Sequence, residues 1–126
     1  MILLDTCGLL WLAEGSERIS AGTRAVIDAE LIVAGSGISA LEIALKVRSG
    51  RLDLPVPVAE WWDRVIAHHR LGVVEARPAI LTRSTELPPL HKDPVDRIII
   101  ATALHARARV VTSDPRFDDY GVETML

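Results

Sequence analysis

Short, uninterrupted apolar runs alternate with longer helical segments along this chain, and this alternation limits the folds that it can adopt. The apolar runs lie at residues 1–4, 31–34, 73–75 and 109–112, with a short fifth at 122–125. The segments between them predict helices at residues 6–14, 21–29, 39–49, 58–70, 77–84 and 93–107. Short apolar strands that alternate with helices are typical of a parallel sheet covered on both faces.

The predicted architecture is therefore a three-layer α/β/α domain around a central parallel sheet of about five strands. Right-handed crossovers favour this three-layer arrangement, and the first and fourth strands of a doubly wound sheet can lie side by side, as in the expected order 3-2-1-4-5. The 126 residues suffice for a single domain, 1–126, and not for two. The single Cys7 excludes a disulfide framework, and we expect it to be a buried, inert thiol.

Glycine and serine residues set the predicted start of the third helix. Gly35-Ser36-Gly37 is expected to break the chain after the second strand. Ser39-Ala40-Leu41-Glu42 then matches a capping box, in which the glutamate reaches back to the cap amide. By itself this pattern makes Glu42 a routine helix-start residue, although the position also lies near the carboxyl edge of the sheet.

Acidic residues follow the strands at the edge where ligands bind in such sheets. Asp5 ends the first strand and Asp114 follows the fourth, so the two should face one another, although either alone is more simply a turn residue. Asp96 is more informative, because the residues one helical turn and two turns further on are apolar and should pack on the sheet. Asp93 is better explained as the N-cap of a helix than as a residue of the site.

Four carboxylates at one edge would repel one another, by about 4 kcal/mol per pair at 4 Å and an effective dielectric constant of 20. Such a cluster persists only where the acids are protonated or paired with cations. All-oxygen ligands suit Mg²⁺, or Mn²⁺ in its place, and such a site serves hydrolysis of a phosphodiester by a metal-activated water. This inference depends on Asp5, Glu42, Asp96 and Asp114 converging, which their spacing alone does not establish.

The segments that carry these acids resemble the PIN-domain family, and more narrowly the VapC toxins of bacterial VapBC toxin–antitoxin pairs. The matching segments, in order, are Leu3-Leu4-Asp5-Thr6, Ser39-x-x-Glu42-Ile43, Asp93-Pro94-Val95-Asp96-Arg97 with the apolar residues after it, and Val111-Thr112-Ser113-Asp114. Each fragment alone is weak, whereas the four in this order are specific. One departure is Leu41, where similar proteins commonly have tryptophan before the glutamate.

The resemblance implies a Mg²⁺-dependent endoribonuclease that acts as a toxin, is usually a homodimer, is masked by a VapB-like antitoxin and cleaves RNA, with tRNA or rRNA as the expected substrate. It carries the catalytic and metal-binding role onto Asp5, Glu42, Asp96 and Asp114. It also assigns supporting roles to Thr6, Ser113 and Asp93. A PIN module that has lost catalysis and only binds RNA or protein is the alternative function.

Arg97, beside Asp96, is the leading candidate for an RNA contact, and a surface salt bridge with Asp93 is about equally plausible. His91 lies near the proposed site, yet an ordinary loop histidine is the better interpretation. Trp11 and one of the adjacent Trp61 and Trp62 are candidates for contacts with a partner or a second copy.

Charge and hydropathy complete the prediction. The net charge of −3 argues at first against a nucleic-acid partner, but without the four proposed site acids the rest of the chain carries +1. No apolar run approaches the roughly 20 residues of a membrane span, and no basic segment precedes the first apolar run. We therefore expect a cytoplasmic protein without a membrane segment.

Overall fold

A five-stranded, wholly parallel sheet organises the computed structural model, which describes residues 1–126. Its strands run in the spatial order β3-β2-β1-β4-β5, so the predicted order 3-2-1-4-5 is confirmed. The strands are β1 (Ile2–Leu4), β2 (Val33–Ser36), β3 (Gly72–Val74), β4 (Arg109–Val111) and β5 (Thr124–Met125). The central strand β1 pairs with β2 on one side and β4 on the other, and Leu4 lies opposite Gly35 and Val111.

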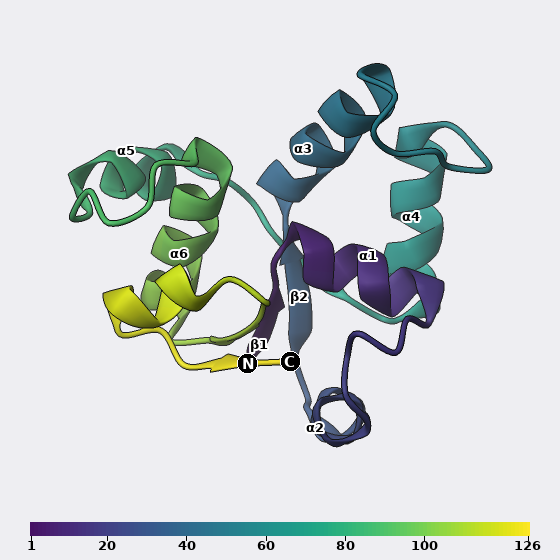
Figure 1. Cartoon of the computed structure of the whole chain (residues 1–126), viewed down its shortest axis with the longest axis horizontal. Helices are drawn as coiled ribbons and strands as arrows, with labels where there is room; N and C mark the ends of the chain where they lie inside the picture. The colour runs from purple at the N-terminus through teal and green to yellow at the C-terminus, as the bar shows by residue number, and fades with distance from the viewer.

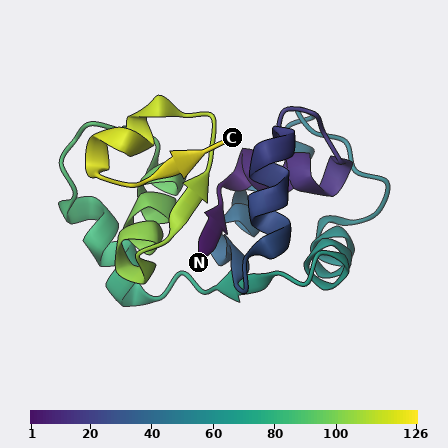
Figure 2. The ribbon, with the colours of Figure 1, turned by 90° about the horizontal axis from the view of Figure 1, so that it is seen from below.

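Helices cover both faces of this sheet, as the alternation of elements predicts. They are α1 (Thr6–Glu14), α2 (Ala21–Ala29), α3 (Gly37–Arg48), α4 (Val58–His68), α5 (Pro78–Glu86), α6 (Pro94–Ala106) and the short 3₁₀ helix η1 (Pro115–Tyr120). Figure 1 shows α1 and α4 on one side of the strands and α5 and α6 on the other, and Figure 2 shows the same separation from below. None of these helices is long and apolar enough to cross a membrane.

The side chains of β1 explain why the sheet has two cores. Ile2 and Leu4 pack with the helices α1, α2 and α4, whereas Leu3 points to the opposite face and packs with α5, α6 and η1. All three side chains are fully buried. A strand buried on both faces needs an unbroken apolar run rather than an alternating one, and residues 2–4 supply it.

The start of α3 differs from the prediction. Gly35 and Ser36 do not break the chain but form the end of β2, where Gly35 pairs with Leu4 and Val73, and Ser36 with Val74. Pairing on both sides outweighs the low strand propensity of glycine. Ser36 is therefore the N-cap, and its Oγ accepts a hydrogen bond from the Ile38 amide at 3.3 Å.

The capping box predicted for Ser39 and Glu42 is consequently wrong. Ser39 lies inside α3, fully buried, and its Oγ accepts a hydrogen bond from the Thr6 hydroxyl at 3.0 Å. Glu42 therefore does not cap the helix, and its carboxylate is available for a site at the carboxyl edge of the sheet. The segment after Asp114 is also more regular than the predicted turn, because it continues into η1.

Gly8 allows α1 to start directly beneath the end of β4. A Cβ atom at this position would lie 2.7 Å from the Val111 carbonyl oxygen and 3.1 Å from Asp5 Oδ1. Gly22, in α2, has more room, since the nearest atom to its Cβ position is Ser20 Oγ at 4.0 Å.

Gly8→Ala should therefore lower the free energy of unfolding by about 1–3 kcal/mol, measured by urea denaturation, because backbone must move to accept the methyl group. Gly22→Ala is the matched control and should stabilise the protein by about 0.5–1 kcal/mol, since alanine restricts the unfolded chain and favours the helix. Equal stability of the two variants would contradict this account of the contact between α1 and β4.

Candidate active site

All four acids predicted from the sequence lie around one cleft at the carboxyl edge of the sheet. The cleft has a volume of about 630 Å³ and is lined by Asp5, Glu42, Asp96 and Asp114. Thr6, Ser113 and Asp93 also line it, together with Lys46, Arg51 and Arg116. The carboxylates therefore converge, which their spacing alone did not establish.

Asp5 is the most deeply placed acid of the cleft, with 6% of its surface exposed. It follows β1 and caps α1, where Oδ1 accepts a hydrogen bond from the Gly8 amide at 2.6 Å. Burial raises the pKa of Asp5, and hydrogen bonds with the Thr112 side chain and the Gly8 amide offset part of that rise. The charges of Glu42 and Asp114 raise the pKa further, so these three acids already interact.

Glu42 projects from the first half of α3. The nearest cation is Lys46, one helical turn further on, with Nζ 3.9 Å from Glu42 Oε1. The hydrogen bond between the buried hydroxyls of Thr6 and Ser39 joins α1 to α3. Thr6 therefore fixes the helix that carries Glu42 relative to the strand that carries Asp5.

Asp96 lies in the first turn of α6, where Asp93 is the N-cap. Asp93 Oδ1 accepts hydrogen bonds from the amides of Val95 and Asp96, at 2.9 and 3.0 Å, as the capping interpretation of the sequence predicts. Burial, followed by the negative charge of Asp93, raises the pKa of Asp96 to about 6. The negative charges of Glu42 and Asp5 also raise the pKa of Asp96.

Asp114 caps η1 after β4, and its surroundings lower its pKa, whereas those of Asp96 raise it. Arg116 donates from Nε to Oδ1 and from Nη2 to Oδ2, both at 3.0 Å, and its backbone amide donates to Oδ1 as well. Burial by itself would raise the pKa of Asp114, but the bonds from Arg116 and from His91 lower it to about 2. Asp114 is thus the acid that stays ionised at every physiological pH.

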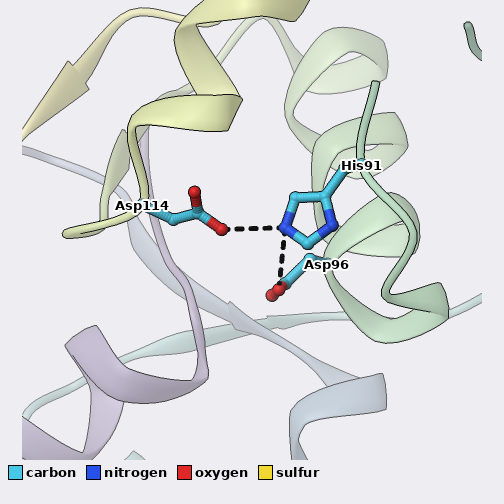
Figure 3. A group of neighbouring side chains, drawn as sticks. All are labelled: His91, Asp96 and Asp114. Carbon is cyan, nitrogen blue, oxygen red and sulfur yellow. Dashed lines mark hydrogen bonds and ion pairs between the residues drawn. The ribbon is translucent and has the colours of Figure 1, made fainter. Parts of the chain in front are cut away.

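His91 is the residue that the sequence interpretation missed. It lies in a loop, as expected, but only 2% of its surface is exposed, and it reaches between two of the acids (Figure 3). Its Nε2 lies 2.8 Å from Asp114 Oδ2 and 3.1 Å from Asp96 Oδ2. The available signal was its position two residues before the cap of α6, which brings it to the edge where Asp96 lies.

Arg97 does not lie in the cleft, and its geometry argues against the predicted RNA contact. Its guanidinium donates to four backbone carbonyls, those of Ser84, Leu87, Pro88 and His91, at 2.7 to 3.0 Å. The predicted salt bridge with Asp93 is also not formed. Arg97 therefore provides the hydrogen-bond donors for carbonyl groups of the segment between α5 and α6.

The remaining sequence candidates have modest roles. Cys7 is not buried as expected but half-buried at the cleft. Burial together with the charge of Asp5 raises the pKa of its thiol, which disfavours the reactive thiolate. Trp61 is buried in the core, and Trp62 packs against that core. Trp11 is half-buried, with the Arg18 guanidinium 4.7 Å from its ring centroid.

The donors around the cleft fit a hard divalent cation. They are carboxylate oxygens. Burial, with a contribution from neighbouring acids, raises the pKa values of Asp5 and Asp96, and a bound cation would offset that cost. His91 Nε2 and oxygens of Asp96 and Asp114 all lie within 4.8 Å of one another, a spacing that also admits an ion.

The fold and this acidic cleft define a parallel α/β domain with a candidate metal site at its carboxyl edge. The sequence matches the PIN domain over residues 2–123. It is 31% identical over 116 residues, 91% of this chain and 88% of the relative, to Ribonuclease VapC22 of Mycobacterium tuberculosis. The chain belongs to the PIN-domain family, and its resemblance to the VapC type is confirmed.

Solved structures with the same fold include two from other bacteria. VapBC2 from Rickettsia felis, bound to a DNA fragment from the promoter, matches with a TM-score of 0.72 and 16% identity over 98% of this chain and 97% of that one. FitAcB from Neisseria gonorrhoeae matches with a TM-score of 0.62 and 21% identity over 100% of this chain and 97% of that one. At these identities the likeness is one of fold.

The pKa of Asp96 generates a test of the electrostatics of the cleft. Because this pKa is about 6 in the folded protein against an ordinary value of 3.8, the folded state disfavours the carboxylate. The stability from this group is present below about pH 4 and is lost as the pH rises through about 6. Asp96→Asn should therefore raise the free energy of unfolding at pH 7.5, in buffer containing EDTA, by about 1–2 kcal/mol.

This gain should disappear at pH 4, where the wild-type carboxyl is protonated as well. Asp63→Asn, at an exposed site on α4, is the matched control and should change stability little at either pH. An Asp96→Asn protein that is no more stable than the wild type at pH 7.5 would show that the cleft does not strain this carboxylate.

Proposed function

We propose that this protein is a Mg²⁺-dependent endoribonuclease and the toxin of a toxin–antitoxin pair. The observation that carries the proposal is the convergence of Asp5, Glu42, Asp96 and Asp114 on one cleft at the carboxyl edge. The similarity to Ribonuclease VapC22 supports RNA as the substrate. The cation held by these acids would lower the pKa of an attacking water and offset negative charge on the phosphate. Mn²⁺ is expected to replace Mg²⁺ in this role.

Each acid has a distinct part in this proposal. Asp5 and Asp96, whose pKa values are raised, gain most from a bound cation, and Asp114 contributes a carboxylate that is always ionised. Glu42 lines the same cleft from α3 and would add a carboxylate to the site. Thr6 and Asp93 support the site by fixing α3 and by capping α6, and Ser113 lines the cleft beside Asp114.

Basic residues at the rim of the cleft support a phosphate-bearing substrate. Lys46, Arg51 and Arg116 all line it. Arg116 is engaged with Asp114, whereas the exposed Arg51 makes one hydrogen bond, from Nε to Ser49 Oγ at 3.0 Å. Arg51 thus retains donors for a phosphate group, and it takes the role of RNA contact that the sequence had suggested for Arg97.

A short apolar face on α3 supports a protein partner, which we propose to be a VapB-like antitoxin. Leu41 and Leu45, one turn apart, are about half exposed, and Leu45 also lines the cleft. A partner segment that covers both leucines would block access to the acids. We also propose that the protein forms a homodimer and is located in the cytoplasm.

Asp5→Asn and Asp96→Asn should each reduce metal-dependent cleavage of single-stranded RNA by more than about 100-fold, because each change removes a charged oxygen ligand. Cleavage is followed by gel electrophoresis, and sequencing of the 5′ ends identifies the sites. EDTA should abolish cleavage by the wild type, and Mg²⁺ or Mn²⁺ should restore it. Expression of the wild type should arrest bacterial growth, and expression of Asp5→Asn should not.

Glu14→Gln and Asp28→Asn, which neutralise exposed acids outside the cleft, are the controls and should cleave like the wild type. Full cleavage by the Asp5 and Asp96 variants would contradict the proposal. A wild-type protein that binds RNA but leaves it intact with either metal would favour the alternative, a PIN module without catalysis.

Arg51→Ala should raise the KM for RNA and leave kcat unchanged, because a phosphate contact away from the scissile bond contributes uniform binding. The slope of log KM against log salt concentration should fall by about 0.7, the contribution of one phosphate contact to a single strand. Arg48→Ala removes an exposed arginine of the same segment that does not line the cleft, and it should change neither value. Identical behaviour of the two variants would exclude Arg51 as the contact.

A further inference from the structure

The ring of His91 is hydrogen-bonded at both nitrogens, and one of these bonds determines where its proton lies. Nδ1 lies 3.1 Å from the backbone nitrogen of Asp93, whose N–H points at it. A backbone amide always donates, so Nδ1 must be the acceptor and carries no proton. A ring turned over would place carbon atoms at both contacts. The neutral ring is therefore protonated at Nε2.

The Nε2 atom of the ring lies close to two carboxylates. It is hydrogen-bonded to Asp114 Oδ2 at 2.8 Å, and Asp96 Oδ2 lies 3.1 Å from the same nitrogen without a hydrogen bond (Figure 3). These oxygens come from η1 and α6, whose acids would otherwise repel each other. The ring contacts both acids, and its hydrogen bond fixes Asp114 relative to the contact with Asp96.

We propose that His91 is a positioning residue, which holds Asp114 through Nε2–H at a fixed distance from Asp96 for a divalent cation and is not itself a ligand of that cation. A ligating nitrogen must be free of its proton, and moving the proton to Nδ1 would bring it against the Asp93 amide. This inference rests on the proposed metal-dependent function, which it deepens.

The loop that carries His91 is built to hold the ring still. The hydroxyl of Tyr120, in η1, donates to the Pro88 carbonyl at 2.6 Å and accepts from the His91 amide at 2.8 Å. Arg97 donates to the carbonyl of His91 at 3.0 Å, and the edge of the ring packs against Phe117. Arg97 therefore acts on the site through His91, which explains an arginine that lies so close to the acids without lining the cleft.

Two substitutions separate the two hydrogen bonds of the ring. Glutamine places an N–H₂ group where His91 has Nε2, at the same number of bonds from Cα, whereas asparagine places an oxygen acceptor where His91 has Nδ1. His91→Gln should keep the donor to Asp114, and His91→Asn should keep only the bond from Asp93. His105→Gln and His105→Asn, at an exposed histidine of α6, are the matched controls.

Mn²⁺ binding, measured by isothermal titration calorimetry, is the first readout. His91→Asn should bind Mn²⁺ about 10- to 100-fold more weakly than the wild type, His91→Gln should stay close to the wild type, and the controls should not change. Urea denaturation of each variant reports on folding separately. Equal weakening in both His91 variants, or a loss of stability without any difference in Mn²⁺ affinity, would overturn the positioning role.

The second readout is the tautomer itself, from long-range ¹H–¹⁵N NMR spectra of the imidazole rings at pH 7.5. The His91 ring should be protonated at Nε2 and bare at Nδ1 without metal, and Mg²⁺ should leave this pattern unchanged. A proton at Nδ1, with or without Mg²⁺, would overturn the inference. Because the metal-free spectrum requires no nuclease activity, failure of the inference and failure of the proposed function are distinguishable: the latter would appear as a wild type that binds no Mn²⁺.

Discussion

Repulsion among carboxylates gathered at one end of the sheet is the constraint on which the site depends. Chain topology brings these acids together, because β1 and β4 are neighbours and end at the same edge. The surrounding structure counters their charge in different ways: an amide and a hydroxyl at Asp5, a guanidinium and an imidazole N–H at Asp114, and the nearby His91 ring at Asp96. Burial raises the pKa of Asp96 to about 6, and the negative charge of Asp93 acts in the same direction.

The same contacts join elements that are far apart in the sequence. Thr6 and Ser39 link α1 to α3, and His91 links the start of α6 to the start of η1. Arg97 and Tyr120 hold the loop between α5 and α6 by its carbonyl and amide groups. The positions of the acids therefore depend on hydrogen bonds between distant segments, many of them buried or half-buried, and Asp114 is held in addition by the exposed Arg116.

Much of the fold and of the acidic cleft follows from the sequence alone, because both depend on local patterns. Unbroken apolar runs indicate the parallel strands, and acids placed just after them indicate the edge where they meet. The features that were missed depend on distant partners. Ser39 matches a capping box locally but contacts Thr6, 33 positions away, and His91 contacts Asp114, 23 positions away. Arg97 appeared to be a surface cation because its backbone partners lie in a loop without a recognisable pattern.

The central claim is that the acids of the cleft bind a divalent cation, and crystals of the protein soaked in Mn²⁺ test it most directly. Anomalous difference density should show a peak in the cleft within about 2–2.5 Å of carboxylate oxygens that include Asp5 and Asp96. His91 Nε2 should keep its contacts with Asp96 and Asp114 and lie outside the coordination sphere. A map at saturating Mn²⁺ with no peak in the cleft would contradict the account.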